Sequence, residues 1–313
     1  MLQHVNPFIG VDGSGECLPG PYLPLGLVRL SPDTVAPQKT NGYCSADPIK
    51  HFSHTHVAGT GGMSRYGNIG VLPFTGVARL HVDPFGRVNE HAACNYYAVT
   101  TANAGVQCEL TATARVGVHR YRFPDNVRAH VLLDVGAAVQ PPFPGYQMDP
   151  NGWPPISVGG FVEFVSDRAL VGRGDYRGGW GHNEPYSIYF YAEFDQPFAE
   201  GRIGQAGSWL PVPGGGSGAN LAAVASFGAA REVNLRVGVS YVSVAKARAS
   251  VTREVGTQSF EEVRQAGEAA WRTVFDRLRV EGGTDAQRTL FATMLTRLYC
   301  LPTDLGVDDE FTS

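Results

Sequence analysis

The sequence predicts a mainly β protein, a large antiparallel β-sandwich followed by a linker helix and one further helix. Three observations predict this fold class. The 313 residues include 39 glycines and 21 prolines but only 17% charged residues, a balance typical of many short strands and tight turns. Apolar and polar residues alternate in several segments between about 92 and 243. Near residue 257 this period of two gives way to helical spacing.

Short apolar segments mark the expected strands. Residues 1 to about 75 are rich in glycine and proline, and two apolar runs there predict strands at 27–30 and 69–74. Three later segments alternate as half-buried antiparallel strands do, at 109–118, 188–194 and 233–241. No helical pattern separates these segments, so we expect two packed antiparallel sheets. The glycine-rich tract 213–218 is expected to be an exposed hairpin loop, because no Lys-Ser/Thr pair follows it for phosphate binding.

Two capping boxes predict where helices begin. Ser259 is followed three residues later by Glu262, and Thr284 by Gln287. The second helix would carry a wide apolar stripe made of Leu290, Phe291, Met294, Leu295 and Leu298. Such a stripe must be buried against something, and little sequence follows it. We therefore expect the chain to be the amino-terminal portion of a longer polypeptide, or one that has lost the rest.

Composition and charge argue against several classes of function. The net charge is −4, so nucleic acid is not expected as a partner. No apolar run reaches membrane-spanning length, and the first residues lack the pattern of a signal peptide. We expect no membrane association, and either a protein that stays in the cell or one whose leader was removed. The five cysteines lack C-x-x-C spacing; Cys94 and Cys108 could pair across a hairpin or stay free.

The segment 52–62 concentrates polar chemistry next to flexible backbone. It reads Phe-Ser-His-Thr-His-Val-Ala-Gly-Thr-Gly-Gly, which predicts an open polar surface rather than packed core. In a strand, His54 and His56 would project to the same face. With His51 they could ligate zinc, although no Cys, Asp or Glu lies close by in sequence. Hydrogen-bonded histidines in a half-buried strand and recognition of a polar ligand are the other two interpretations.

Ordered motifs run through almost the whole chain. They are Val5-Asn6-Pro7-Phe8-Ile9-Gly10, Pro19-Gly20 with Pro24-Leu25-Gly26, Leu30-Ser31-Pro32-Asp33-Thr34, Gly42-Tyr43, Phe52-Ser53-His54-Thr55-His56 with Gly59-Thr60-Gly61, Phe194-Asp195-Gln196-Pro197-Phe198, and Val280-Glu281-Gly282-Gly283-Thr284 with Gln287-Arg288. In these motifs and in their order the chain resembles glycoside hydrolase family 92. The departures are the absence of a histidine around Gly13 to Glu16, the pair Lys50-His51 before Phe52, and the altered loop 63–66, so the mannoside linkage preference stays open.

The resemblance implies a specific activity and domain order. Members of the family are calcium-dependent exo-acting α-mannosidases that invert the anomeric configuration. They join an amino-terminal β-sandwich to a carboxy-terminal (α/α)6 barrel. On that template, residues 1–250 resemble the sandwich, 251–283 the helical linker, and 284–313 the first barrel helix. The resemblance places the general acid and base, and most calcium ligands, in the barrel beyond Ser313, so we assign no catalytic residue and no metal ligand to this chain.

Eight residues are the candidates for contact with an α-mannoside glycan. The resemblance points to Gly13, Gly15, Gly42, Tyr43, His54 and His56 as part of the pocket rim, and we add Glu16 and Trp180. Tyr43 could instead be an ordinary core anchor. Asp33, within Ser-Pro-Asp-Thr, is expected to cap backbone N–H groups of a turn. The chain alone is expected to be inactive, and the family's members are expected to be secreted or periplasmic.

Two further functions stay open. A stand-alone carbohydrate-binding sandwich would use Tyr43, Trp153 and Trp180 as a stacking surface without catalysis. A zinc hydrolase would use His51, His54 and His56. The first predicts loss of mannoside affinity in Trp180→Ala, and the second predicts zinc that copurifies with the protein.

Overall fold

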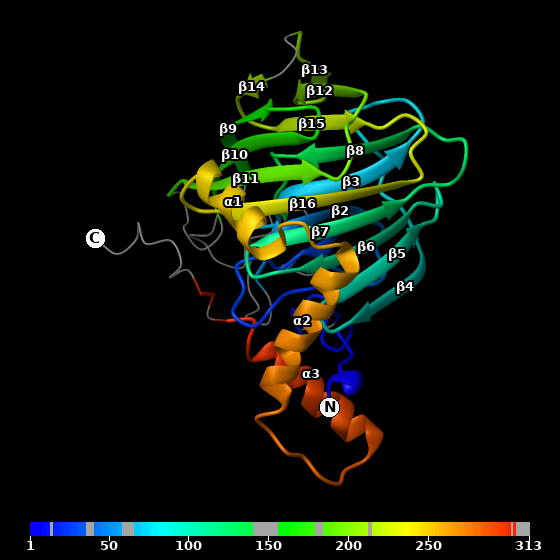
Figure 1. Ribbon diagram of the computed structural model, residues 1–313, viewed down its shortest axis with the longest axis vertical. Coiled ribbons are helices and arrows are strands. Elements are labelled where there is room, and N and C mark those ends of the chain that lie inside the picture. The colour runs from blue at the N-terminus through cyan, green and yellow to red at the C-terminus, as the bar shows by residue number, and fades with distance from the viewer. Residues whose placement is uncertain are drawn as a thin grey trace.

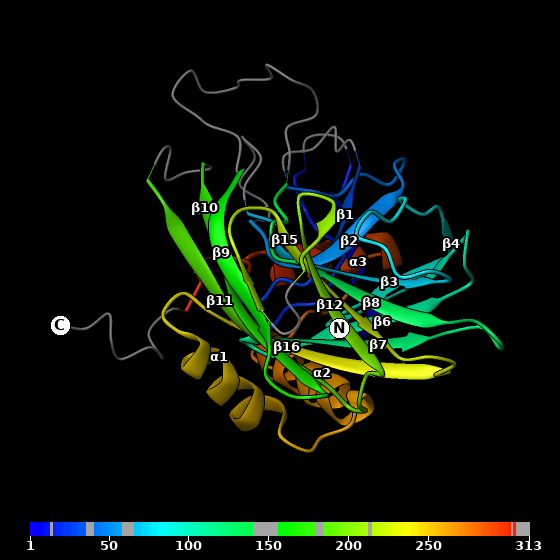
Figure 2. The same ribbon diagram turned by 90° about the horizontal axis from the view of Figure 1, so that it is seen from above.

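A computed structural model describes residues 1–12, 15–35, 41–57, 66–139, 156–178, 184–211, 215–301 and 303–304. Two antiparallel sheets pack face to face, and three α-helices follow them along the chain (Figures 1 and 2). The predicted fold class, a mainly β sandwich followed by helices, is therefore confirmed. A short 3₁₀ turn, η1 (Leu2–His4), opens the chain. Among the described residues, no helix has the length and apolar character needed to cross a membrane.

Both sheets are wholly antiparallel in their neighbouring pairs. The seven-stranded sheet has the order β1 (Ser31–Thr34), β2 (Ile49–Thr55), β3 (Asn68–Thr75), β8 (Ala129–Asp134), β15 (Leu221–Ser226), β12 (Glu200–Gln205) and β13 (Ser208–Trp209). The nine-stranded sheet has the order β14 (Gly215–Ser217), β9 (Ile156–Phe164), β10 (Ala169–Arg177), β11 (Tyr186–Phe194), β16 (Glu232–Ser240), β7 (Val116–Arg122), β6 (Gln107–Ala112), β5 (Tyr96–Thr101) and β4 (Arg87–Ala93).

The main core lies between the two sheets. Alternate residues of each strand point inward, as the period of two requires. Phe52 of β2 contacts Tyr97 of β5 across the interface, with ring centroids 6.3 Å apart. Burying side chains of this size contributes about 1.5–3 kcal/mol each, so this layer is the main source of stability.

The strands expected at 69–74, 188–194 and 233–241 are confirmed as β3, β11 and β16. The single strand expected at 109–118 is wrong, because β6 and β7 form a hairpin there. Thr113 N donates to the Val116 carbonyl at 2.9 Å, and Val116 N donates to the Thr113 hydroxyl at 3.1 Å. This turn contains no glycine or proline between its strands, so it left no signal in the sequence.

Two smaller strand predictions also fail. No strand forms at 27–30, where Arg29 makes only an isolated bridge to Tyr22. The tract 213–218 is not only a loop, because β14 pairs with β9 at the sheet edge. Residues 213 and 214 lie outside the described residues. The five cysteines are free, so Cys94 and Cys108 do not form a disulfide.

Both predicted capping boxes are present. Helix α2 (Phe260–Phe275) begins after Ser259, and α3 (Asp285–Arg297) after Thr284, each with the reciprocal cap–backbone hydrogen bonds. Helix α1 (Val244–Ser250), which the π-helical segment η3 (Val251–Val255) continues, was not predicted from the sequence. Its residues are mostly small or charged, so no helical periodicity of apolar residues predicts it.

Helices α1 and α2 lie across the outer side of the nine-stranded sheet (Figure 2). Polar contacts fix α2 there: Arg120 of β7 bonds to Glu109 of β6 at 2.8 Å and to Glu261 of α2 at 2.7 Å. Arg236 of β16 donates to the carbonyl oxygens of Gly256 and Gln258 in the connection before α2.

A second, smaller core joins α2 and α3 to the start of the chain, beside the amino terminus in Figure 1. Trp271 of α2 is 1% exposed, and its indole N–H donates to the Tyr22 carbonyl at 2.8 Å. Arg297, at the end of α3, donates to the carbonyl oxygens of Leu18 and Pro7. The first loops therefore pack against the last helix.

Candidate functional site

One corner of the sandwich brings two early loops together. Asn41 Nδ2 donates to the Cys17 carbonyl at 2.6 Å. Ser45 N donates to an Asp12 carboxylate oxygen at 3.1 Å. These bonds place the loop 41–45 beside the first loop of the chain.

The end of β2 meets the segment after α3 in the same region. Arg29, only 6% exposed, donates to the carbonyl oxygens of His56 and Cys300 and to the Thr303 hydroxyl. A pocket of about 310 Å³ lies here. Its lining includes Arg29, His56, Tyr66, Tyr241 and Thr303. These groups can exchange hydrogen bonds with a hydroxyl-rich ligand.

Asp33 of β1 is the polar centre beneath this corner, and it is 3% exposed. Its carboxylate accepts hydrogen bonds from His51 Nε2 at 3.0 Å, Ser53 Oγ at 2.6 Å and His56 Nε2 at 2.8 Å. The pairing of β1 with β2 explains why these side chains meet. Asp33 lies opposite His51, and Ser53 follows on the same face of β2. We call these four residues the Asp33 cluster. The expectation that Asp33 caps a turn is wrong.

His56 uses both of its ring nitrogens in buried contacts. Its Nδ1 lies 2.7 Å from the Arg29 carbonyl oxygen, and its Nε2 lies 2.8 Å from the Asp33 carboxylate. Burial by itself would raise the pKa of Asp33. The charge of His56 and the hydrogen bonds from His51 and His56 outweigh burial and hold that pKa well below its usual value.

Four predicted site residues lie around these loops. Gly42 has φ +110°, and a Cβ on it would lie 2.3 Å from Asp33 Oδ1, so only glycine fits over the carboxylate. Gly15 is exposed and its backbone approaches Gly10 closely, while Glu16 is partly exposed with φ +50°. Sugar contacts by Gly15, Glu16, Gly42 and His56 stay a prediction.

Tyr43 is fully buried rather than presented to solvent. Its hydroxyl donates to Glu90 Oε1 at 2.9 Å, and the Arg87 guanidinium lies over its ring at 5.4 Å. Burial, and then Glu90, raise the pKa of this hydroxyl well above its ordinary value. These contacts fit the interpretation of Tyr43 as an ordinary core anchor.

His54 does not share a face with His56, which corrects the prediction from the H-x-H spacing. Strand β2 ends at Thr55, so alternation stops before His56. His54 points into the core between the sheets, where its Nδ1 donates to the Ile69 carbonyl at 2.7 Å. Its ring occupies the space that a side chain at Gly117 would fill. The prediction that this segment is an open polar surface is also wrong for residues 52–57, which are all buried.

The partners of His54 were not predicted from the sequence. His119 Nε2 lies 3.1 Å from His54 Nε2, and the Tyr121 hydroxyl lies 2.7 Å from His119 Nδ1. Since His54 Nδ1 donates to a carbonyl, its Nε2 must accept from His119, which in turn accepts from Tyr121. The result is a one-way chain of hydrogen bonds from the nine-stranded sheet to the seven-stranded sheet. We call it the histidine relay. It requires both imidazoles to be neutral.

Acid should therefore destabilise the protein through this relay. Burial lowers the pKa of His54 from 6.5 to about 4, and burial followed by His54 holds the pKa of His119 well below 6.5. Above pH 6.5 both imidazoles are neutral in the folded and in the unfolded chain, so their titration does not reduce the free energy of unfolding. As the pH falls towards 4, the unfolded chain binds protons first, so His54 alone should remove about 3 kcal/mol from the free energy of unfolding.

Urea unfolding between pH 7.5 and pH 4.5 measures this loss. The variant His54→Gln should show a shallower pH dependence than the parent, by about 1.4 kcal/mol per pH unit. His91→Gln is the matched control, since His91 is exposed and its loss should leave the slope unchanged. A parent protein with a flat profile over this range would contradict the neutral relay.

Three predicted aromatic or loop positions, Gly13, Trp153 and Trp180, lie outside the described residues. The zinc hypothesis is not supported, because His51 and His56 turn to Asp33 while His54 turns to His119. Across the described part of the chain, no three or more His, Cys, Asp or Glu side chains are grouped to hold a metal ion.

Family models match nearly the whole chain. Residues 4–240 match the model described as the glycosyl hydrolase family 92 N-terminal domain, and residues 246–311 match its catalytic domain. A protein of Arthroderma benhamiae described as an uncharacterized secreted glycosidase is 22% identical over 97% of this chain and 42% of its own length.

Solved structures agree with the family match. A family GH92 α-mannosidase from Bacteroides thetaiotaomicron superposes with a TM-score of 0.83 at 26% identity, over 94% of this chain and 40% of its own. The same enzyme has been solved in complex with mannoimidazole. A family GH92 inverting mannosidase from that organism shares the fold, with a TM-score of 0.80 at 23% identity over 96% of this chain and 40% of its own. The chain thus spans about two fifths of the length of these relatives.

Proposed function

Since the chain belongs to glycosyl hydrolase family 92, we propose that it is the amino-terminal part of an inverting exo-α-mannosidase that removes terminal α-mannosides from glycans. In this role the corner around the Asp33 cluster forms part of the rim of the sugar pocket. The general acid and base, and most calcium ligands, belong to the rest of the catalytic domain. The protein is secreted or periplasmic, in line with the description of the fungal relative.

The exposed apolar face of α3 is the observation that carries the proposal. Of the predicted stripe, only Leu295 is buried; Leu290 is 51% exposed, Phe291 42%, Met294 38% and Leu298 71%. Contiguous exposed side chains of this size mark an interaction site. A catalytic domain that continues from this helix would cover them.

The buried carboxylates of the described chain are already engaged. Inverting hydrolysis needs one protonated carboxyl and one free carboxylate about 6.5–9.5 Å apart. Asp33 is bound by the histidines, and Glu109 accepts from Arg120, Arg122 and Tyr96. Burial would raise the pKa of Glu109, but the hydrogen bonds from Arg120 and Tyr96 lower it, so it is no proton donor at neutral pH. These contacts support a general acid and base elsewhere.

Activity measurements test the proposal. The purified 313-residue chain should not release mannose from an aryl α-mannoside or a mannobiose. A protein extended by the coding sequence downstream of Ser313 should release it, with β-mannose as the first product detected by NMR. Release of mannose by the 313-residue chain would contradict the proposal, and so would an extended protein that is inactive on all α-mannosides.

The helix face gives an independent prediction. Replacing Leu290 and Leu298 by glutamate should change the free energy of unfolding of the chain by less than about 0.5 kcal/mol, because both side chains are exposed. It should also abolish mannose release by the extended protein. The control Leu295→Glu buries a charge and should unfold α3. An extended protein that keeps full activity with the two glutamates would contradict the covered face.

A further inference from the structure

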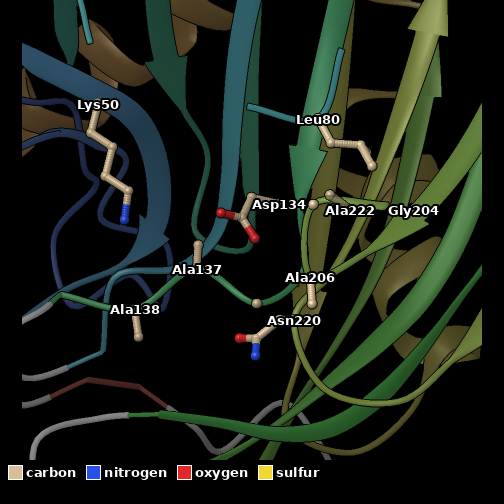
Figure 3. A pocket seen from close by; sticks show the side chains of 11 residues that line it. Lys50, Leu80, Asp134, Ala137, Ala138, Gly204, Ala206, Asn220 and Ala222 are labelled. Carbon is tan, nitrogen blue, oxygen red and sulfur yellow. The ribbon is translucent and has the colours of Figure 1, made fainter. Parts of the chain in front are cut away.

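A polar groove crosses the outer face of the seven-stranded sheet, opposite the core. Val131 and Leu133 of β8 belong to the main core, so the alternate residue Asp134 points outward. Beside it lies a pocket of about 330 Å³ (Figure 3). A second pocket of about 350 Å³ shares Lys50, Leu80 and Asp134 with the first, so the two form one groove.

Three polar side chains from separate parts of the chain surround the first pocket in Figure 3. Lys50 lies at a bulge of β2, where the register with β1 shifts. Asp134 ends β8, and Asn220 precedes β15 with φ +54°. Within the described part of the chain, these three side chains make no hydrogen bond or ion pair with another residue. Among the described residues, the groove therefore offers one ammonium, one carboxylate and one amide to a ligand.

Small residues make up the rest of the first pocket. They include Ala137, Gly204, Ala206 and Ala222, whose side chains leave the backbone within reach of a ligand. The Leu80 side chain supplies an apolar wall (Figure 3). On such a surface, methyl groups can contact the C–H bonds of a ligand, and polar groups can bond to its hydroxyls.

We propose that this groove binds a neutral carbohydrate, with one pyranose ring beside Asp134 and Asn220 and a linked ring beside Lys50 and Leu80. The carboxylate accepts from vicinal hydroxyls, the ammonium donates to them, and the amide does both. The single positive and single negative charge cancel, which favours an uncharged polyol over an anion. The glycan class rests on the proposed function, whereas the site itself rests on the geometry.

Binding experiments on the full 313-residue chain test the groove. Methyl α-mannopyranoside and an α-linked mannobiose should bind in the millimolar range by calorimetry, with the mannobiose tighter. Amide shifts in NMR should cluster at 134–138, 204–207 and 220–222. Asp134→Asn should weaken binding at least about tenfold, because it removes a charged acceptor. Ala222→Leu should block binding by filling the pocket while leaving each polar group in place.

Asp167→Asn is the matched control, since Asp167 is exposed in the turn between β9 and β10. It should bind the sugars as the parent does. Binding that survives both Asp134→Asn and Ala222→Leu would overturn the proposal. So would the absence of sugar binding, or tighter binding of inorganic phosphate or glycine than of either sugar. Hydrolysis by the extended protein is measured separately, so the groove can fail while the mannosidase assignment holds, and the reverse.

Discussion

Replacing Asp33 by asparagine should lower the free energy of unfolding by about 3–5 kcal/mol, measured by urea denaturation at pH 7. The amide keeps the shape of the carboxylate but removes the charged acceptor that His51, Ser53 and His56 share in the buried cluster. It also turns an N–H group towards histidine N–H groups that need an acceptor. Because the pKa of Asp33 is held below its ordinary 3.8, its stabilising effect is present at all pH values above that and is lost only in stronger acid.

The chain contains a matched exposed pair as the control. Asp83 lies 3.8 Å from His81, and the two side chains are 86% and 89% exposed. Asp83→Asn should therefore change the free energy of unfolding by less than about 0.5 kcal/mol. Equal effects of Asp33→Asn and Asp83→Asn would show that the buried cluster does not stabilise the fold.

Truncating Trp271 to alanine should cost about 3–5 kcal/mol, because it empties the centre of the smaller core. The indole contacts Tyr22 edge to face at 5.4 Å and Tyr299 at 5.9 Å, and its N–H satisfies the Tyr22 carbonyl. Thermal unfolding followed by near-ultraviolet circular dichroism measures the loss. Trp271→Phe keeps part of the packing and should fall between the parent and Trp271→Ala.

Trp209→Ala is the control for the same change of side chain. Trp209 is partly exposed on the edge strand β13, where the Arg202 guanidinium lies 4.0 Å from its ring centroid. Its truncation should cost about 1 kcal/mol or less. If Trp209→Ala were as damaging as Trp271→Ala, the smaller core would not be what holds the helices to the first loops.

The parts of the fold set by local chemistry could be predicted from the sequence. The alternation of β11 and β16 and both capping boxes appear where the residue patterns place them. The hairpin between β6 and β7 could not be predicted, because Thr113 makes its turn with a hydroxyl rather than with glycine or proline. Likewise α1 has no apolar stripe, since its contacts are small residues against β11 and β16.

The candidate site was predicted less well, because its contacts are set by strand pairing. The role of Asp33 depends on the register that places it opposite His51, and His119 meets His54 only across the packed sheets. Neither distance follows from spacing in the sequence. Gly42 is different: the glycine could be selected from the sequence, but its close approach to Asp33 emerged only from the structure.

The contacts between the first loops and α3 join residues that lie far apart in the sequence. Asn6 meets Thr293, and Pro7 meets Arg297, across 287 and 290 positions. Closing a loop of that length costs more conformational entropy than pairing neighbouring strands, so these contacts form slowly. We expect the sheets to assemble before α3 settles. During synthesis, the contacts of the amino-terminal loops with α3 would then form only after α3 has left the ribosome.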